Sequence, residues 1–148
     1  MTDLRTILLV EDDQRDVELT LKALKASKLS NPVAVVNDGV EALEYLQYEG
    51  KYKQRKKEFP SVVLLDIKMP RMDGLELLRI INNDKILSTL PVVMLTSSRE
   101  DPGLKECYAL GANAYVVKPI DYKEFIDSVT ALGIFWALIN ESSPELKT

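Results

Sequence analysis

The chain has 148 residues, a formal net charge of −4 and 46% hydrophobic residues, so we expect one globular domain built on one core. The negative charge argues against nucleic-acid binding through a basic surface, and the absence of histidine excludes metal sites and acid–base catalysis that use histidine. The single cysteine cannot form an internal disulfide and no apolar run approaches the roughly 20 residues that span a bilayer, so we expect a soluble cytoplasmic protein.

Strand and helix patterns alternate from the start of the chain. The apolar run Thr6–Val10 predicts a buried strand, and the acidic run Glu11–Asp13 follows it directly. Apolar residues then recur at helical spacing over Val17–Leu24, and Asp13 is placed to cap that helix. The β-branched run Val33–Val36 predicts a second strand, and an Asn-Asp-Gly turn signal separates it from a second helix.

A polar segment, Glu49–Phe59, separates the second helix from the third predicted strand. It carries five basic residues, Lys51, Lys53, Arg55, Lys56 and Lys57. We interpret it as an exposed loop or helix extension with solvated charges, because runs of charge most often lie on the surface.

The third predicted strand leads into Asp66. Between Pro60 and Asp66 the chain is almost continuously aliphatic, which is typical of a strand buried on both faces in a parallel sheet. Asp66 therefore lies at the carboxyl end of this strand, the edge at which open α/β sheets bind ligands. A third helical pattern begins at Leu75.

The rest of the chain repeats the alternation twice. The runs Pro91–Thr96 and Ala114–Val117 predict the fourth and fifth strands, and a short helix is expected over Leu104–Leu110 between them. The fifth strand ends at Lys118–Pro119, and a long last helix is predicted over about residues 122–141, before a polar tail.

This alternation predicts a single α/β domain over residues 1–148. Strands and helices that alternate five times indicate a doubly wound, flavodoxin-like fold with five helices and a five-stranded parallel sheet. We predict the strand order 2-1-3-4-5. This order places the first strand beside the third, so that Glu11, Asp12 and Asp66 meet at one edge.

Three acids at one point of the sheet repel one another and raise each other's pKa. A divalent cation relieves this repulsion, and carboxylate ligands favour Mg²⁺ or Mn²⁺. At the neighbouring strand ends Lys118 adds a positive charge and Thr96 a hydroxyl that can donate to a phosphoryl oxygen. Together these groups suit phosphoryl transfer onto the carboxylate of Asp66.

Each of these features also has a structural interpretation. Acids after a strand are often helix caps, Lys118–Pro119 alone is typical of a turn, and Thr96 alone of a strand end. Tyr115 lies in an apolar strand, where an aromatic residue is usually part of the core. Their joint appearance at successive strand ends favours the functional interpretation.

These strand ends resemble those of CheY-like receiver domains of two-component response regulators, over roughly residues 5 to 130. The matching motifs are Leu9–Asp13, Asp66, Met69–Pro70, Met72–Gly74, Thr96–Ser97 and Tyr115–Pro119. The resemblance implies that Asp66 is the phosphate acceptor, converted to 4-aspartylphosphate. It implies a metal held directly by Asp12 and Asp66, through water by Glu11, and by the backbone carbonyl of Lys68.

The resemblance also implies how the phosphate is sensed. Thr96 and Lys118 would bind the phosphoryl group, and Tyr115 would turn inward when Thr96 moves. The surface formed by the fourth and fifth strands and helices would then repack. The Lys118–Pro119 bond is expected to be cis, which proline permits at low cost. The Lys68 side chain could hold the phosphate or hinder attacking water, and this choice stays open.

A narrower resemblance rests on two further features of the sequence. The basic insert, residues 51–57, and Phe135–Trp136 in the last helix are similar to features of single-domain regulators partnered with phytochrome-type histidine kinases. It implies a homodimer through the last strand and last helix, with Tyr115, Phe135 and Trp136 at the interface. The alternative is that Phe135 and Trp136 pack within one chain. No membrane or nucleic-acid partner is expected.

Three other functions fit parts of the pattern. A metal phosphohydrolase with an aspartyl-phosphate intermediate would carry an acid two residues after the nucleophile, where this chain has Lys68. A flavodoxin-like cofactor carrier needs a Ser/Thr/Gly-rich phosphate loop after the first strand, where this chain has acids. A pure interaction module would not need the intact phosphorylation residues. We therefore expect phosphorylation of the protein itself and slow self-dephosphorylation, without turnover of an external substrate.

Overall fold

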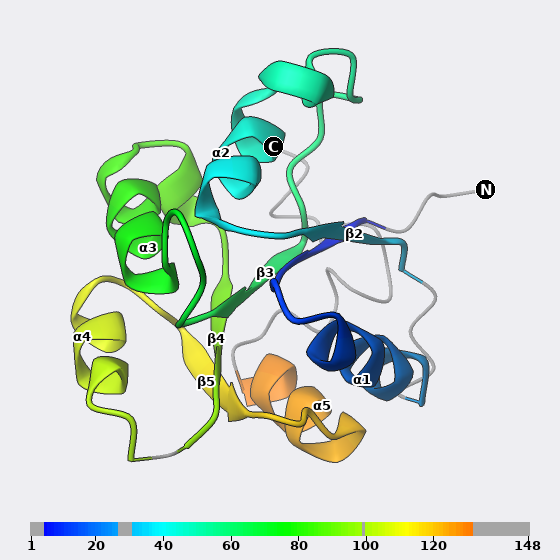
Figure 1. Cartoon of the computed structure of the whole chain (residues 1–148), viewed down its shortest axis with the longest axis vertical. Helices are drawn as coiled ribbons and strands as arrows, with labels where there is room; N and C mark the ends of the chain where they lie inside the picture. The colour runs from blue at the N-terminus through cyan, green and yellow to red at the C-terminus, as the bar shows by residue number, and fades with distance from the viewer. Residues whose placement is uncertain (1–4, 27–30, 99, 132–148) are drawn as a thin grey trace.

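A computed structural model describes residues 5–26, 31–98 and 100–131 of the chain. These residues form a five-stranded parallel sheet in the order β2-β1-β3-β4-β5 (Figure 1). The strands are β1 (Ile7–Val10), β2 (Val33–Val36), β3 (Val62–Asp66), β4 (Val92–Thr96) and β5 (Ala114–Val117). The predicted fold class and strand order are thereby confirmed.

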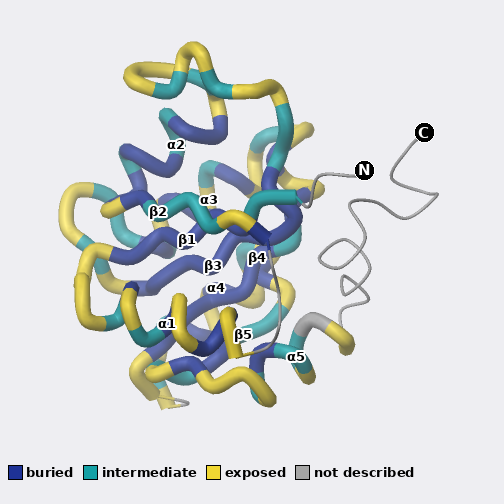
Figure 2. Tube along the Cα trace, turned by 90° about the vertical axis from the view of Figure 1, so that its right-hand side faces the viewer, coloured by how far each residue is buried: buried dark blue, intermediate teal, exposed yellow. Residues whose placement is uncertain are grey.

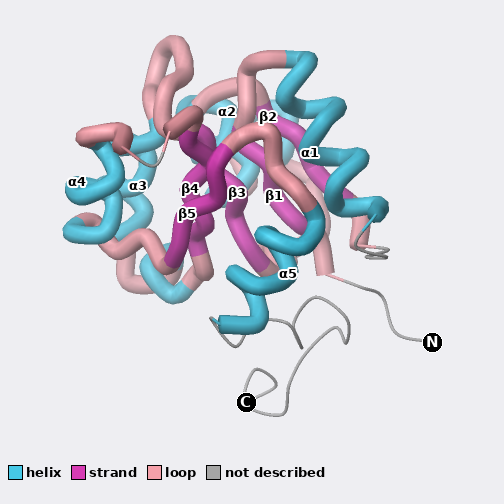
Figure 3. Tube along the Cα trace, turned by 90° about the horizontal axis from the view of Figure 1, so that it is seen from below, coloured by secondary structure: helices cyan, strands magenta, loops and turns pink. Residues whose placement is uncertain are grey.

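Among the described residues, four helices and two short 3₁₀ turns connect the strands, and a fifth helix follows β5. The helices are α1 (Gln14–Ala26), α2 (Gly39–Gln47), α3 (Gly74–Asn83), α4 (Gly103–Ala109) and α5 (Tyr122–Ala131). The turns are η1 (Gly50–Tyr52) and η2 (Leu87–Thr89). Helices α1 and α5 cover one face of the sheet, and α2, α3 and α4 cover the other, so that the strands lie between two helical layers (Figure 3).

The apolar runs form strands because both faces of the sheet are covered. In β1, Leu8 and Val10 pack toward α2, α3 and α4, whereas Ile7 and Leu9 pack toward α1 and α5. All four side chains are fully buried, and the exposed parts of the chain lie outside them (Figure 2). A half-exposed strand would show alternating polar residues, and none of these four positions holds one.

Aspartates cap the starts of several helices at the carboxyl edge of the sheet, among them α1, α2 and α3. The side chain of Asp13 accepts a hydrogen bond from the Asp16 amide at 3.1 Å, as predicted for the start of α1. Asp38 and Asp73 do the same for α2 and α3, each at 2.9 Å from an amide three residues later. These caps place the helix starts, and the loops before them, at fixed positions around the ends of β1, β2 and β3.

The basic insert is more ordered than the sequence suggests. Its lysines are exposed, but Arg55 is half-buried, and its guanidinium lies 3.8 Å from the centre of the Tyr45 ring. The same group donates hydrogen bonds to the carbonyl oxygens of Tyr45 at 2.7 Å and Glu58 at 2.9 Å. The expectation of a wholly solvated segment is therefore wrong for Arg55, which fastens the insert to the end of α2.

The predicted last helix is described only through Ala131. The remainder of that helix, Phe135, Trp136 and the polar tail lie outside the described residues, so the extended helix and the dimer surface stay predictions. Within the parts of the chain that the structure covers, there is no helix with the length and apolar character to cross a membrane.

Candidate functional site

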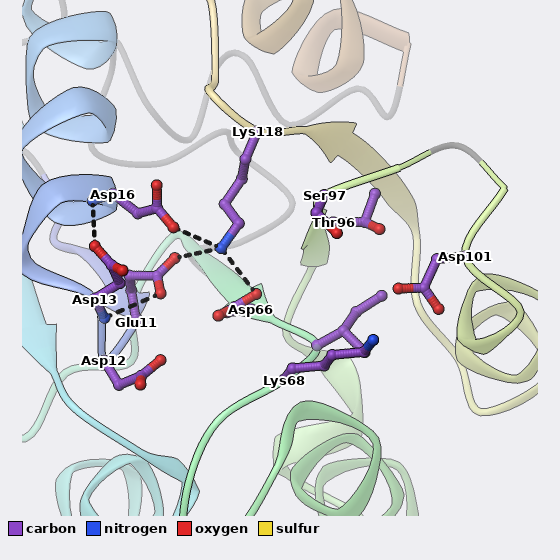
Figure 4. Close-up of a pocket in the computed structure, with 11 residues that line it drawn as sticks. Glu11, Asp12, Asp13, Asp16, Asp66, Lys68, Thr96, Ser97, Asp101 and Lys118 are labelled. Carbon is purple, nitrogen blue, oxygen red and sulfur yellow. Dashed lines mark hydrogen bonds and ion pairs between the residues drawn. The ribbon is translucent and has the colours of Figure 1, made fainter.

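A polar pocket opens at the carboxyl edge of the sheet, where β1, β3, β4 and β5 end (Figure 4). Its lining brings together every pocket residue expected from the sequence and adds Asp13, Asp16, Ile67, Ser97 and Asp101. The complete lining is Glu11, Asp12, Asp13, Asp16, Asp66, Ile67, Lys68, Thr96, Ser97, Asp101 and Lys118.

Three acids converge because two neighbouring strands end together. Val10 of β1 pairs with Leu65 of β3, so the residues that follow them project from adjacent points of the edge. Glu11, Asp12 and Asp66 each offer one carboxylate oxygen, and these three oxygens lie within 4.8 Å of one another. Glu11 and Asp66 are buried and Asp12 is exposed, so one side of the cluster faces solvent. This donor set fits a hard divalent cation such as Mg²⁺ or Mn²⁺.

The ammonium group of Lys118 lies among the acids. It is 3.1 Å from Glu11 Oε1, 2.9 Å from Asp16 Oδ2 and 3.2 Å from Asp66 Oδ1 (Figure 4). The backbone amide of Lys118 donates to the Thr96 carbonyl at 2.7 Å, and the peptide bond to Pro119 is cis. The lysine therefore reaches across the end of β4 from the edge strand to the centre of the sheet.

Asp16 is a site residue that the sequence analysis missed. Its place in the first turn of a helix already explains an acid there, through the helix dipole. The pattern held one further signal: the first turn of α1 begins at the same edge as the predicted pocket. The structure shows that Asp16 also makes the shortest of the three ion pairs with Lys118, at 2.9 Å.

Burial and mutual repulsion shift the ionisation of the acids. Burial, followed by the charge and hydrogen bond of Asp66, raises the pKa of Glu11 to about 7, although Lys118 opposes the shift. Burial likewise raises the pKa of Asp66, against the opposing effects of Glu11 and Lys118. Burial alone would lower the pKa of Lys118, but its bond to Asp16 and the charges of Asp66 and Glu11 raise it. The single positive charge of Lys118 does not balance the negative charge of these acids. A divalent cation bound among them would supply the missing positive charge.

Thr96 lies on the pocket wall, but its hydroxyl is not directed at Asp66. The Oγ1 atom donates to the Ser98 carbonyl at 2.9 Å and accepts from the Ser98 amide at 3.3 Å. The side chain is almost fully buried at the end of β4. The structure therefore shows the hydroxyl bound to the β4–α4 loop.

Tyr115 lies at the border of the core. Its half-buried ring packs against the apolar cluster under α2, α3 and α4, in keeping with its interpretation as a core residue. It also meets the exposed ring of Tyr108 edge to face, with 6.2 Å between ring centres. The roles of Tyr115 as a switch residue and as an interface residue stay predictions.

The loop between β3 and α3 holds Lys68 at the pocket. The Lys68 side chain is exposed and lies on the same side of the pocket as Asp101 (Figure 4). The loop closes where the Gly74 amide donates to the Ile67 carbonyl at 2.8 Å. A Cβ atom on Gly74 would collide with the carbonyl oxygen of Asp66 and lie 2.9 Å from the Cα of Ile67.

We predict that Gly74→Ala lowers the free energy of unfolding by about 1–3 kcal/mol, because the backbone around Asp66 must shift to admit the methyl group. Chemical denaturation measures this loss. Gly103→Ala, at the start of α4, is the control: its closest contact is a side-chain oxygen at 3.1 Å, and little change is expected. Equal stability of the two variants would contradict the tight contact at Gly74.

The chain matches the family model of the response regulator receiver domain over residues 7–130. It is 33% identical over 132 residues to response regulator Rcp1 of Synechocystis sp., which covers 89% of this chain and 88% of the relative. The match spans all five strands and helices α1 to α4, and all but the last described residue of α5.

Solved structures with the same fold include bacteriophytochrome response regulators. RtBRR is 53% identical, with a TM-score of 0.85 over 95% of this chain and 85% of that one. AtBRR is 52% identical, with a TM-score of 0.86 over 94% and 99%. The Mn²⁺-bound form of Rcp1 is 32% identical, with a TM-score of 0.72 over 94% and 97%. The phosphorylated cyanobacterial phytochrome response regulator RcpA is 33% identical, with a TM-score of 0.74 over 95% and 97%.

Proposed function

The chain belongs to the family of response regulator receiver domains, and from that premise we propose that Asp66 accepts a phosphoryl group from a histidine kinase. The observation that carries the proposal is the position of Asp66. Its carboxylate lies at the end of the central strand, beside two further acids and 3.2 Å from the ammonium group of Lys118. In this proposal the whole chain, residues 1–148, acts as one receiver domain in a two-component phosphorelay.

The proposed metal ligands are Asp12 and Asp66 directly, Glu11 through water, and the backbone carbonyl of Lys68. The three carboxylate oxygens within 4.8 Å support this assignment, and the relative Rcp1 has been solved in a Mn²⁺-bound form. We propose Mg²⁺ or Mn²⁺ in this chain. When bound, such an ion supplies positive charge that offsets the acids and the incoming phosphate.

The chemical step is an in-line displacement at phosphorus. A carboxylate oxygen of Asp66 attacks the phosphoryl group, the bond between phosphorus and the histidine nitrogen breaks, and its electron pair stays on the imidazole. Lys118 is already within reach of Asp66 and stabilises the charge on the phosphoryl oxygens. The product is 4-aspartylphosphate, which carries about two negative charges.

That charge is proposed to drive the switch. The Thr96 hydroxyl would leave Ser98, to which it is bonded in this structure, and donate to a phosphoryl oxygen. Tyr115 would move toward the space that Thr96 leaves. The surface of β4, α4, β5 and α5 would then repack, as a population shift between two arrangements that the phosphate binds differently.

The metal and a proton are expected to compete at the site. Below pH 7 Glu11 holds a proton, since its pKa is raised to about 7, and ionised Glu11 becomes available above that pH. We therefore predict that Mg²⁺ affinity rises between pH 6 and pH 8 and that binding at pH 6 releases a proton. Calorimetry in two buffers of different ionisation enthalpy measures both effects, and an affinity independent of pH across this range would contradict them.

We further propose a phytochrome-type histidine kinase as the partner and the cytoplasm as the location. The support is the resemblance to RtBRR and AtBRR, which are bacteriophytochrome response regulators. The same proposal includes a homodimer through the face of β4 and α5 and the predicted extension of that last helix. Its interface would hold Tyr115, Phe135 and Trp136. Radiolabel transfer from candidate kinases tests the partner, and equal transfer from unrelated kinases would argue against a cognate pair.

An enzyme that hydrolyses external phosphomonoesters is the main competing function. The lysine two residues after Asp66 speaks against it, because that position would need an acid for general acid–base catalysis. We propose that the chain catalyses only its own phosphorylation and slow dephosphorylation. Sustained turnover of a small phosphomonoester, lost in Asp66→Asn, would favour the hydrolase instead.

A further inference from the structure

We propose that Arg71 is a positioning residue of the metal site. Its ion pair with Asp38 fastens the loop Ile67–Asp73 to the start of α2, so that the backbone carbonyl of Lys68 is kept at the pocket. This inference rests on the proposed function, because it assumes that the pocket binds a divalent ion through that carbonyl.

The loop is anchored at its base by its own backbone. Asp66 ends β3, and the Gly74 amide donates to the Ile67 carbonyl at 2.8 Å, which closes the loop directly beneath the acids. The close approach of Gly74 to the Asp66 carbonyl holds this base tightly. Lys68 lies one residue beyond the closed base, so the direction of its carbonyl depends on how the rest of the loop is held.

The tip of the loop is anchored on a different element. Arg71 Nε lies 2.6 Å from Asp38 Oδ2, and the neighbouring Met72 carbonyl accepts the Gly39 amide at 3.1 Å. A Cβ atom on Gly39 would lie 2.7 Å from that carbonyl, so the two backbones meet without room for a side chain. The tip therefore lies directly on the first turn of α2.

Asp38 both caps α2 and holds the tip of the loop. It is buried, and its Oδ1 atom accepts the Glu41 amide at 2.9 Å to begin α2, while Oδ2 accepts the Arg71 guanidinium. An asparagine has one oxygen and so can serve one of these partners fully. The position of α2 and the position of the loop are thereby coupled through one carboxylate.

The backbone of Arg71 indicates that its side chain matters. Arg71 has a φ of 62°, a left-handed conformation that a residue with a Cβ adopts at a cost. Its side chain is 60% exposed, so burial in the core does not offset that cost. The charge-assisted hydrogen bond to Asp38 is the side-chain contact that supports this conformation, beside the backbone bonds of Met72 to Pro70 and Gly39.

The test is Mg²⁺ affinity, measured by calorimetry on the full chain. We expect Arg71→Gln and Asp38→Asn each to raise the Kd for Mg²⁺ by about tenfold, in the range typical of groups that orient metal ligands. The double variant should bind no more weakly than either single one, because both remove the same contact. Arg71→Gly, which adopts the left-handed φ freely, should bind as weakly as Arg71→Gln.

Arg79→Gln is the matched control. Arg79 also pairs with an acid, Glu106 at 3.3 Å, and its side chain is 51% exposed, but it lies on α3 away from the loop. Its Mg²⁺ affinity should equal that of the unaltered chain. Amide exchange of the metal-free protein gives a second readout: the loop should exchange faster in Arg71→Gln, while β1 and β3 keep their protection.

The two levels of failure are distinct. If the unaltered chain binds no Mg²⁺, the proposed function itself fails. If it binds Mg²⁺ and the Arg71 variants bind equally well, or if Arg71→Gly restores the affinity, the metal site stands and the positioning role of Arg71 is overturned.

Discussion

The Asp66→Asn variant is expected to take up no phosphoryl group from a small phosphodonor in the presence of Mg²⁺, whereas the unaltered chain takes up one. The amide keeps the size of the side chain and removes the nucleophilic oxygen and its charge. Because Asp66 is buried among like charges, and burial raises its pKa, loss of the carboxylate should not impair folding. Intact-protein mass measures the uptake, and circular dichroism checks the fold.

Asp84→Asn provides the control for this experiment. Helix α3 begins at the pocket edge of the sheet and runs away from it, so Asp84, at the end of α3, lies at the opposite edge. Asp84 accepts hydrogen bonds from the amides of Ile86 and Leu87. An asparagine can accept the same bonds. Phosphorylation of this variant should equal that of the unaltered chain, and persistent labelling of Asp66→Asn would reject Asp66 as the acceptor.

Lys118→Met should impair both chemistry and stability. It removes the ammonium group that lies near Asp66, Glu11 and Asp16, and methionine keeps a side chain of similar length. Loss of one positioned donor to the phosphoryl group should reduce the rate of phosphorylation about a hundredfold. Without metal, the unpaired acids should lower the free energy of unfolding by about 3 kcal/mol at pH 8.

The loss of stability should depend on pH and on metal. At pH 6 the acids of Lys118→Met take up protons and repel less, so the difference from the unaltered chain should be smaller than at pH 8. Added Mg²⁺ should recover part of the difference. Denaturation of Lys123→Met, an exposed change on α5, gives the reference. Unchanged stability and phosphorylation of Lys118→Met would show that the three ion pairs do not matter.

The positions of the acids could be predicted because they follow from the order of the strands in the sheet. A strand buried on both faces is recognisable as an apolar run, and the order of the strands determines which strand ends meet. Glu11 and Asp66 lie together because β1 pairs with β3 in register, which needs no knowledge of side chains. The same logic placed Lys118 and Thr96 on the pocket wall.

The contacts between side chains could not be predicted in the same way. The pairing of Asp16 with Lys118 depends on how a helix and an edge strand sit across the pocket, and the bond of Thr96 to Ser98 depends on the path of a loop. The packing of Arg55 on Tyr45 is similar: a run of basic residues carries no periodic signal that separates one buried guanidinium from four exposed lysines. Such contacts arise from tertiary geometry.

The energetics of the pocket explain why its residues act together. Glu11 and Asp66 are both buried at the end of an apolar sheet, where an isolated carboxylate is costly. Lys118 offsets part of this cost, and a divalent ion would offset more. A pocket with this excess of negative charge favours the binding of a cation. The charge of the pocket changes again when Asp66 carries a phosphate with about two negative charges.

The central claim is that acids from two neighbouring strands share one divalent ion beside the phosphate acceptor. A crystal structure of the chain grown with Mn²⁺, with anomalous scattering recorded for manganese, tests it most directly. We predict one manganese peak in the pocket, with oxygens of both Asp12 and Asp66 bound to it. A pocket without a peak at saturating Mn²⁺, or an ion bound by only one of the two aspartates, would contradict it.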